Sequence, residues 1–285
     1  MKIKLMMYTV LKFFNGLIVR KKVFLIFLIF SGNMIYSQSD WVNYLSERDL
    51  GLMSVHVDLG LNYVKPNYKN LLIVGSKFEG CMTNGFPNDN GMNELYTFSD
   101  SLSQVVKRVT KSKLVGVLTY QCYGFDVFYV KDTANLREEI NRMISDNFKS
   151  SNSYITIKND RKWNYYYENI FPTNAPNDFF VDHEYLTEMV AQGDDLKEER
   201  LVTHWLKFRK EKKMIKFVND VKGLKFSVDS LYSGKDALYP FEVELSRKDK
   251  INPKSINTLT NTLKVLAMKM GGQYEGWGTE VKINE

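Results

Sequence analysis

The stretch "GGQYEGWGTEVKI", Gly271 to Ile283, decides how the C-terminal region folds. It follows a segment of helical periodicity and has the alternation of a β-strand. Counting back from Ile283 places Trp277 on the core side. The opposite side then carries Tyr274, Gly276, Gly278 and Glu280. Glycine in a strand marks a bulge or a close approach of another group. These residues therefore predict bare backbone on an open sheet face, where the first domain or a partner docks. A bulge at Gly276 would instead reverse which side chains face the core, and would expose Trp277.

The residues upstream predict an α+β domain that ends with this strand. A short helix over 182–193 precedes the pattern β-α-β-β-α-β, which is typical of the ferredoxin-like fold. Gly223 ends the first helix of that pattern, and Asn252 with Pro253 begins the second. The expected strands are "RLVTHWLKF" (200–208), "LKFSV" (224–228) and "FEVEL" (241–245), with the inward residues Leu224, Phe226, Val228, Phe241, Val243 and Leu245.

Residues 39–172 predict a second α+β domain, again an antiparallel sheet with helices on one face. The expected order is β-β-α-β-β-α-β-β, with a turn near Gly124. Its last strand is "WNYYYEN" (163–169), which would place three aromatic rings on one face, either as packing or as a stacking platform. Residues 173–181 follow as a linker, and the C-terminal domain is expected over 182–285.

The first 37 residues have the layout of a secretory signal. A basic start precedes eight apolar residues, Val23 to Phe30, and then small and polar residues. Because a bilayer span needs roughly 20 apolar residues, we expect cleavage after Ser37, no stable membrane anchor, and a periplasmic or secreted protein. The long stretch before this leader suggests a start further downstream. An amphipathic membrane helix is the competing interpretation.

Charge argues against a nucleic-acid partner. Six of the 39 basic residues and none of the 33 acidic residues lie in the first 37 positions, so the remaining chain has no formal net charge. Nucleic-acid binders owe much of their affinity to neutralising phosphates. The basic run "KFRKEKK" (207–213) is interpreted as solvated surface.

The chain has two cysteines, Cys81 and Cys122. They form a disulfide or remain as two buried thiols, and spacing does not decide between these alternatives. Neither lies in a CxxC arrangement, which gives no support to thioredoxin-like chemistry.

Two family resemblances follow from these segments. "YEGWGTEV" (274–281) and the layout from Asp182 to Ile283 resemble the regulator of ribonuclease E activity B family. "GFP" (85–87), "LVGVLTYQCYGFDVFYV" (114–130) and "WNYYYENIFP" (163–172) make the N-terminal segment similar to domain of unknown function 695. The first resemblance implies a ferredoxin-like fold and protein binding rather than catalysis. The acid-rich tail of that regulator has no counterpart here.

No catalytic, cofactor or metal motif is evident. His56 and His204 fall within strands and are expected to be packed or hydrogen-bonded, and the acids near His183 suit a helix start. "NDNGMNE" (88–94) fails the calcium-loop pattern and predicts a turn into a helix. The leading hypothesis is an exported module that binds another protein. The alternatives are an enzyme with a cleft between the domains, around His183 and the acids of 194–199, and a ribonuclease regulator whose leader is not a signal.

Overall fold

The computed structural model describes residues 41–61, 67–148, 152–173, 175, 179–234 and 236–283. The predicted signal over 1–37 lies outside these residues. Within them, none of the helices combines the length and the hydropathy that a membrane span requires.

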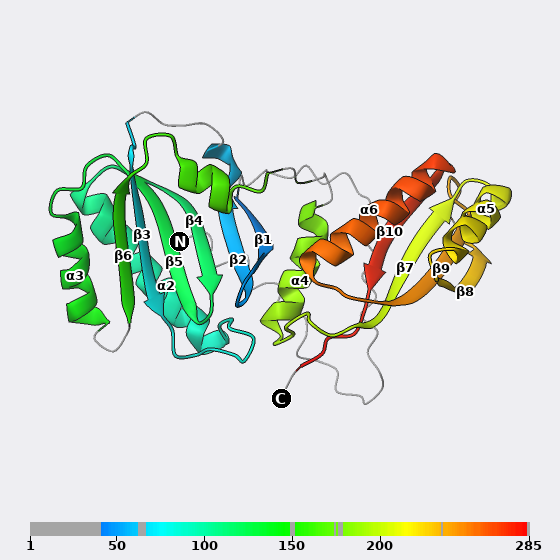
Figure 1. Cartoon of the computed structure of the whole chain (residues 1–285), viewed down its shortest axis with the longest axis horizontal. Coiled ribbons are helices and arrows are strands. Elements are labelled where there is room, and N and C mark those ends of the chain that lie inside the picture. Colours follow the sequence, from blue (N-terminus) through cyan, green and yellow to red (C-terminus); the bar gives the residue numbers. More distant parts are fainter. Residues whose placement is uncertain are drawn as a thin grey trace. The chain divides into compact units, whose positions relative to one another are not determined.

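A six-stranded antiparallel sheet organises the N-terminal half (Figure 1). Its strand order is β1-β2-β4-β5-β3-β6. The strands are β1 (Trp41–Arg48), β2 (Gly51–Asp58), β3 (Asn70–Lys77), β4 (Ser112–Tyr120), β5 (Tyr123–Val130) and β6 (Ser153–Asn159), and a short 3-10 turn, η1 (Leu59–Leu61), follows β2. Strand β1 was not predicted. The β4–β5 turn is formed by Gln121 and Cys122, which have φ angles of 49° and 65°, whereas the sequence predicted it near Gly124. Two consecutive left-handed residues are what a tight hairpin turn requires.

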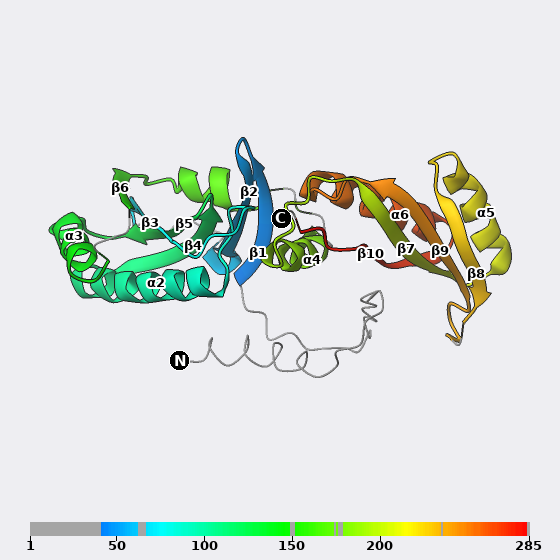
Figure 2. The ribbon, with the colours of Figure 1, turned by 90° about the horizontal axis from the view of Figure 1, so that it is seen from below.

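Two helices cover one face of this sheet, as predicted. They are α2 (Asp89–Val109) and α3 (Leu136–Asn147), and Figure 2 shows both on the same side of the strands. The side chain of Asn88 accepts a hydrogen bond from the Gly91 N–H and so caps α2. The "NDNGMNE" segment is therefore the start of a helix.

The opposite face is covered by residues that the sequence assigned to a strand. The segment after β6 turns into a helix that includes the π-helix η2 (Tyr166–Ile170), so the predicted strand over 163–169 is wrong. Asp160 explains the difference. Its carboxylate accepts hydrogen bonds from the N–H groups of Asn164 and Tyr165 at 2.9 and 3.0 Å, which favours a helix start.

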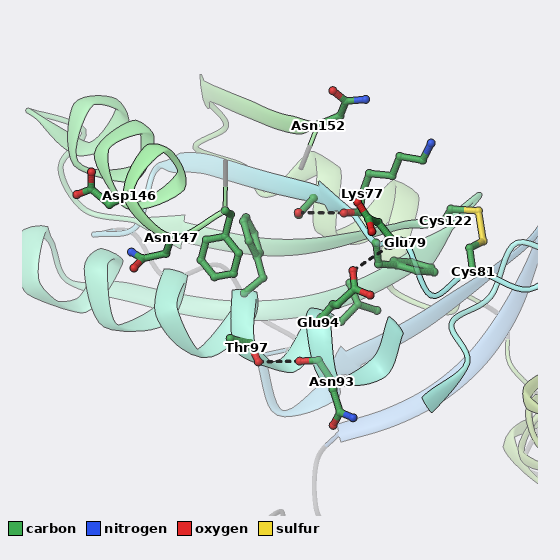
Figure 3. Close-up of a pocket in the computed structure, with 15 residues that line it drawn as sticks. Lys77, Glu79, Cys81, Asn93, Glu94, Thr97, Cys122, Asp146, Asn147 and Asn152 are labelled. Carbon is green, nitrogen blue, oxygen red and sulfur yellow. Dashed lines mark hydrogen bonds between the residues drawn. A yellow bond between two sulfur atoms is a disulfide. The ribbon is translucent and has the colours of Figure 1, made fainter. Parts of the chain in front are cut away.

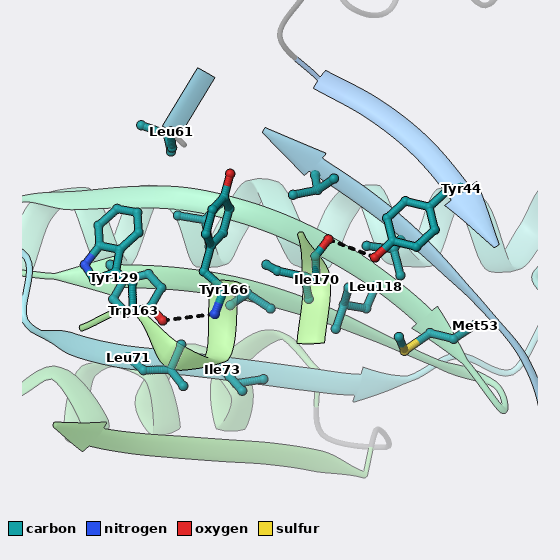
Figure 4. Packing of buried hydrophobic residues seen from close by; sticks show 14 residues of the cluster. Tyr44, Met53, Leu61, Leu71, Ile73, Leu118, Tyr129, Trp163, Tyr166 and Ile170 are labelled. Carbon is teal, nitrogen blue, oxygen red and sulfur yellow. Dashed lines mark hydrogen bonds between the residues drawn. The ribbon is translucent and has the colours of Figure 1, made fainter. Parts of the chain in front are cut away.

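Trp163 lies in the core beneath this turn (Figure 4). It is fully buried, and its ring stacks on Tyr129 with 4.1 Å between centroids. The indole N–H donates to the Tyr68 carbonyl at 2.8 Å. The aromatic residues of this segment therefore pack the second face of the sheet, and the ring of Trp163 is not available as an exposed stacking platform.

The C-terminal half has a four-stranded antiparallel sheet of order β10-β7-β9-β8. The elements are α4 (Phe179–Ala191), β7 (Arg200–Phe208), α5 (Glu211–Lys222), β8 (Ser227–Ser233), β9 (Phe241–Asp249), α6 (Pro253–Lys269) and β10 (Gly272–Gly278). Their order from β7 onward is the predicted β-α-β-β-α-β. Helices α5 and α6 share one core with β7 and β9, so both cover the same face of the sheet (Figure 1).

Two boundaries differ from prediction. Helix α4 begins at Phe179 rather than at residue 182. Strand β8 begins at Ser227, after Lys225 at a φ of 65°. Leu224 therefore precedes the strand and is exposed, whereas Phe226 is buried and Val228 is partly buried. The left-handed residue breaks the alternation on which the prediction over 224–228 depended.

Candidate protein-binding surface

The terminal glycine-rich strand contains a β-bulge that sets which side chains face the core. In the pairing of β10 with β7, Tyr274 is opposite Leu206 and Gly276 is opposite Trp205, so Glu275 is the extra residue. Trp277 is opposite the buried His204 and faces the helices, as predicted. The bulge also turns Tyr274 to the core side, which corrects its predicted outward position.

Trp277 is held by a buried carboxylate. Its indole N–H donates to Asp182 at 2.8 Å, and its ring meets Tyr185 edge-on at 4.7 Å. The second oxygen of Asp182 accepts a hydrogen bond from the Thr260 hydroxyl at 2.7 Å. Burial raises the pKa of Asp182, although the hydrogen bonds from Thr260, Trp277 and Asn257 favour its charged form. One side chain thus links α4, α6 and β10.

Tyr274 and His204 form a second buried polar contact. The Tyr274 hydroxyl lies 2.8 Å from Nδ1 of His204. Burial, helped by the positive charge of Arg247, lowers the pKa of His204 to about 3, so the ring is neutral near pH 7. His204 is completely buried, which makes it a packed residue, as expected, and removes it from contact with a ligand.

The remaining two histidines also have structural contacts. Nδ1 of His183 accepts a hydrogen bond from the Leu45 N–H at 2.9 Å, and burial lowers its pKa to about 4. His56 meets Trp41 edge-on at 4.9 Å, and burial lowers its pKa. Among the described residues, no group of three or more histidine, cysteine, aspartate or glutamate side chains is arranged to hold a metal ion.

The acids near 194–199, considered for a cleft enzyme, do not converge on a substrate position. Asp194 is fully buried in an ion pair with Arg200. Glu198 pairs with Lys282 at 2.9 Å and Asp195 with Lys197 at 3.1 Å. The carboxylates of Asp194, Asp195 and Glu198 therefore form ion pairs within the chain.

The face of the sheet opposite α5 and α6, here called the open face, presents three rows of side chains across the four strands. The strand register defines these rows as Gly278–Thr203–Ser246–Ser227, Gly276–Trp205–Glu244–Ser230 and Gln273–Lys207–Glu242–Tyr232. The first row is small and hydroxyl-bearing, and its two central residues, Thr203 and Ser246, are buried. The other two rows carry aromatic rings and charges. The sequence already contains these residues at alternate positions, as Thr203, Trp205 and Lys207 in "RLVTHWLKF" and as Glu242 and Glu244 in "FEVEL".

The two predicted glycines have different roles on the open face. Gly276 has a φ of +149°, which few residues other than glycine adopt, and open space lies where a Cβ would be. A Cβ on Gly278 would lie 2.9 Å from the Trp205 ring. The indole of Trp205 therefore covers Gly278, and of these two glycines Gly276 alone leaves the backbone bare.

Acidic groups outnumber basic groups around the Trp205 and Tyr232 rings of the open face, whereas the exposed Lys248 lies on the same face beyond the Thr203–Ser246 row. Lys207 pairs with Glu275 at 3.2 Å. Glu242 accepts a hydrogen bond from Tyr232, and Glu244 accepts one from Ser230 at 3.3 Å. Three carboxylates thus accompany one ammonium group around the Trp205 and Tyr232 rings. Aromatic rings of this kind are enriched in protein interfaces, and carboxylates favour a basic partner surface.

Glu280, the last residue predicted for the interaction surface, follows β10. Its carbonyl accepts a hydrogen bond from Arg200 at 3.1 Å, and its side chain is exposed. Of the five residues predicted there, Gly276 and Gly278 lie on the open face, Glu280 lies beyond its edge, and Tyr274 and Trp277 support the strand from the core side.

The N-terminal half contains a separate hollow of about 1110 Å³ (Figure 3). It lies beside the end of β3, the first turns of α2 and the end of α3, and Cys81 and Cys122 are at its rim. The two sulfur atoms are bonded, with 5.5 Å between the Cα atoms. Both oxygens of Glu94 accept hydrogen bonds from the N–H groups of Glu79 and Gly80. Glu94, one of the carboxylates that line the hollow, therefore has a structural role.

Comparison with known proteins finds a similar family model for each half. Residues 181–279 match the family model described as "Regulator of ribonuclease activity B". Residues 39–171 match the "Family of unknown function (DUF695)". Both resemblances expected from the sequence are confirmed. No curated protein matches the chain.

Two solved structures are only distantly similar. One is an unknown protein from Galdieria sulphuraria, 6% identical, with 75% of this chain and 99% of that chain covered and a TM-score of 0.21. The other is a putative glycine cleavage system transcriptional repressor, 9% identical, with 75% and 98% covered and a TM-score of 0.22. Likenesses this low carry no conclusion about fold or function.

Proposed function

We propose that this chain is an exported protein that binds a second protein through the open face. One of its regions matches the regulator of ribonuclease activity B model, and the other matches the DUF695 model. The three-row surface carries the proposal. Trp205 and Tyr232 provide aromatic area, Gly276 leaves room for close approach, and Glu242 and Glu244 suit a lysine- or arginine-bearing segment.

Charge disfavours a second copy that pairs through the same face. Symmetric pairing of two open faces about an axis near Glu242 and Glu244, which are neighbours on β9, would bring these acids close to the same acids of the second copy. Like charges at close range disfavour such an arrangement. A basic partner avoids that cost and gains paired charges. The family description, which concerns regulation of another protein's activity, also supports a protein partner.

Site-specific photocrosslinking is the direct test. We expect a photoreactive residue at position 205 to crosslink one cellular protein repeatedly, whereas the same residue at position 268 on α6 does not. The variant E242K/E244K should lose that crosslink. E211K/D220K, which changes the charge equally on exposed positions of α5, should keep it. The proposal would be refuted if E242K/E244K and E211K/D220K gave the same yield of the crosslinked product. It would also be refuted if position 205 crosslinked only to a second copy of the chain.

Export is supported by the leader, with its basic start and its apolar run from Val23 to Phe30. N-terminal sequencing of the natural protein, together with cell fractionation, tests this part independently. A chain that starts at Gln38 outside the cytoplasm supports export. A cytoplasmic chain that retains the leader favours the second candidate, a cytoplasmic ribonuclease regulator, for which the family match of residues 181–279 is the specific observation. Inhibition of a purified ribonuclease would then be measured.

A further inference from the structure

Helices α5 and α6 form a basic outer layer on the side of the sheet opposite the open face. Their sequences have net charges of +2 and +3. Six of their lysines are exposed, namely Lys212, Lys213, Lys216, Lys222, Lys254 and Lys269. Since both helices pack on the same face of the sheet, their outer surfaces point in one direction. The layer is basic although the chain after the leader has no formal net charge.

Apolar side chains project from the same layer. Met268 is 62% exposed and Val265 is 41% exposed, three residues apart on α6, and Ile215 on α5 is 47% exposed. The exposed Lys269 follows the α6 pair in sequence. Residues three apart on a helix lie on one side of it, so Val265 and Met268 form one apolar patch beside lysines.

The acids with hydrogen bonds to α6 lie near its start, where Glu47 accepts from the Lys254 N–H at 3.2 Å. The buried Asp182 of α4 meets α6 through Asn257 and Thr260, in the first half of that helix. Val265, Met268 and Lys269 lie in its last two turns. The acids on α5 are Glu211 and Asp220, outnumbered by four lysines. The apolar patch is therefore surrounded mainly by positive charge.

From this combination we infer that the outer layer of α5 and α6 docks on an anionic lipid surface. Lysine ammonium groups are attracted to anionic headgroups, and projecting aliphatic side chains enter the boundary between headgroups and acyl chains. A nucleic acid would use the lysines but would gain nothing from Val265 and Met268, so the apolar patch favours the membrane. The open face, on the other side of the sheet, stays accessible in this orientation, but the inference does not depend on a protein partner.

Vesicle sedimentation of the protein with its natural N-terminus tests this inference. We expect binding to vesicles of equal parts phosphatidylglycerol and phosphatidylcholine, little binding to phosphatidylcholine alone, and weaker binding at high salt. The variant K212E/K216E should reduce the affinity roughly tenfold or more. R161E/K162E, an equal charge change at exposed positions of the first half, should leave the affinity unchanged. Any contribution of the leader is common to all variants.

A second variant separates lipid from nucleic acid. V265S/M268S keeps all charges and should weaken vesicle binding by roughly tenfold, because it removes the apolar contribution. Fluorescence anisotropy with single-stranded RNA is the parallel measurement. If RNA binds more tightly than the anionic vesicles, or if V265S/M268S binds vesicles like the unmodified protein, the inference is wrong. Circular dichroism of each variant confirms that the fold is kept.

Discussion

Arg200 and Asp194 form an ion pair whose side chains are both completely buried. Nη2 of Arg200 lies 3.0 Å from Oδ1 of Asp194, and its Nη1 also donates to the Glu280 carbonyl. The Lys282 N–H donates to the second oxygen of Asp194 at 2.8 Å. The pair therefore fixes the segment after β10 against the start of β7. It also gives a structural role to Asp194 in the turn "GDD" (193–195) that follows α4.

Removal of one partner of this pair should be costly. We expect D194A and R200M each to lower the free energy of unfolding by about 3–5 kcal/mol, because each leaves an uncompensated buried charge. Urea denaturation measures the change. K197A removes the exposed half of the Asp195 pair and should cost less than about 1 kcal/mol. If K197A lowered the free energy of unfolding as much as D194A or R200M does, the structural role given to the Asp194–Arg200 pair would be wrong.

Gly276 is expected to be intolerant of a side chain although it has open space around it. Its φ of +149° is the reason, because an L-residue there costs about 1–3 kcal/mol of backbone strain. G276A should lower the midpoint of thermal unfolding. The matched control is G223A, at a φ of −62°, where alanine should be neutral or slightly stabilising. Equal tolerance at the two positions would show that the bulge is not formed.

Much of the fold could be predicted from local patterns. The alternation in "FEVEL", the cap formed by Asn252 and the inward Trp277 all agree with the structure. The misses have specific causes. The period of two in "WNYYYEN" was misleading because Asp160 caps a helix start from outside that segment. Tyr274 was placed outward because strict alternation counted back from Ile283 leaves out the extra residue Glu275, although the glycines had indicated a bulge close to this position.

The open face was only half predictable. Gly276 and Gly278 pointed to it, but Trp205, Glu242 and Glu244 become neighbours only through the pairing of β7 with β9 and β10. Strand register across three segments that are far apart in sequence is a tertiary property. Local alternation gives the face of each residue but does not give its neighbours.

Asp126 should make stability depend on pH. It is 4% exposed on β5, one of its carboxylate oxygens has no hydrogen-bond partner among the described residues, and burial raises its pKa from 3.8 to about 6. Ser99 lowers this pKa and the charge of Asp100 raises it further. The folded state therefore holds the proton more tightly than the unfolded state does. The resulting stabilisation is complete below about pH 4 and is lost as the pH rises to about 6.

D126N isolates this effect from the titration of other acids. Relative to the unmodified protein, the asparagine variant should be more stable above pH 6, by roughly 3 kcal/mol, and nearly equal to it at pH 4. Chemical denaturation of both proteins across this range measures the difference. A difference that does not vary with pH would mean that the Asp126 carboxylate is solvated in the folded state.

The disulfide between Cys81 and Cys122 should stabilise the fold without being essential to it. It closes a loop over a sequence separation of 41, and crosslinks of this kind contribute about 2–4 kcal/mol. Backbone hydrogen bonds hold the same two segments without it, from the Phe78 N–H to the Cys122 carbonyl at 3.0 Å and from the Cys122 N–H to the Gly85 carbonyl at 2.9 Å. Reduction should therefore lower the thermal midpoint while the native circular dichroism spectrum persists at room temperature. The double variant C81A/C122A should match the reduced protein and show no response to reductant, and a variant that unfolds outright would show that the backbone contacts are insufficient.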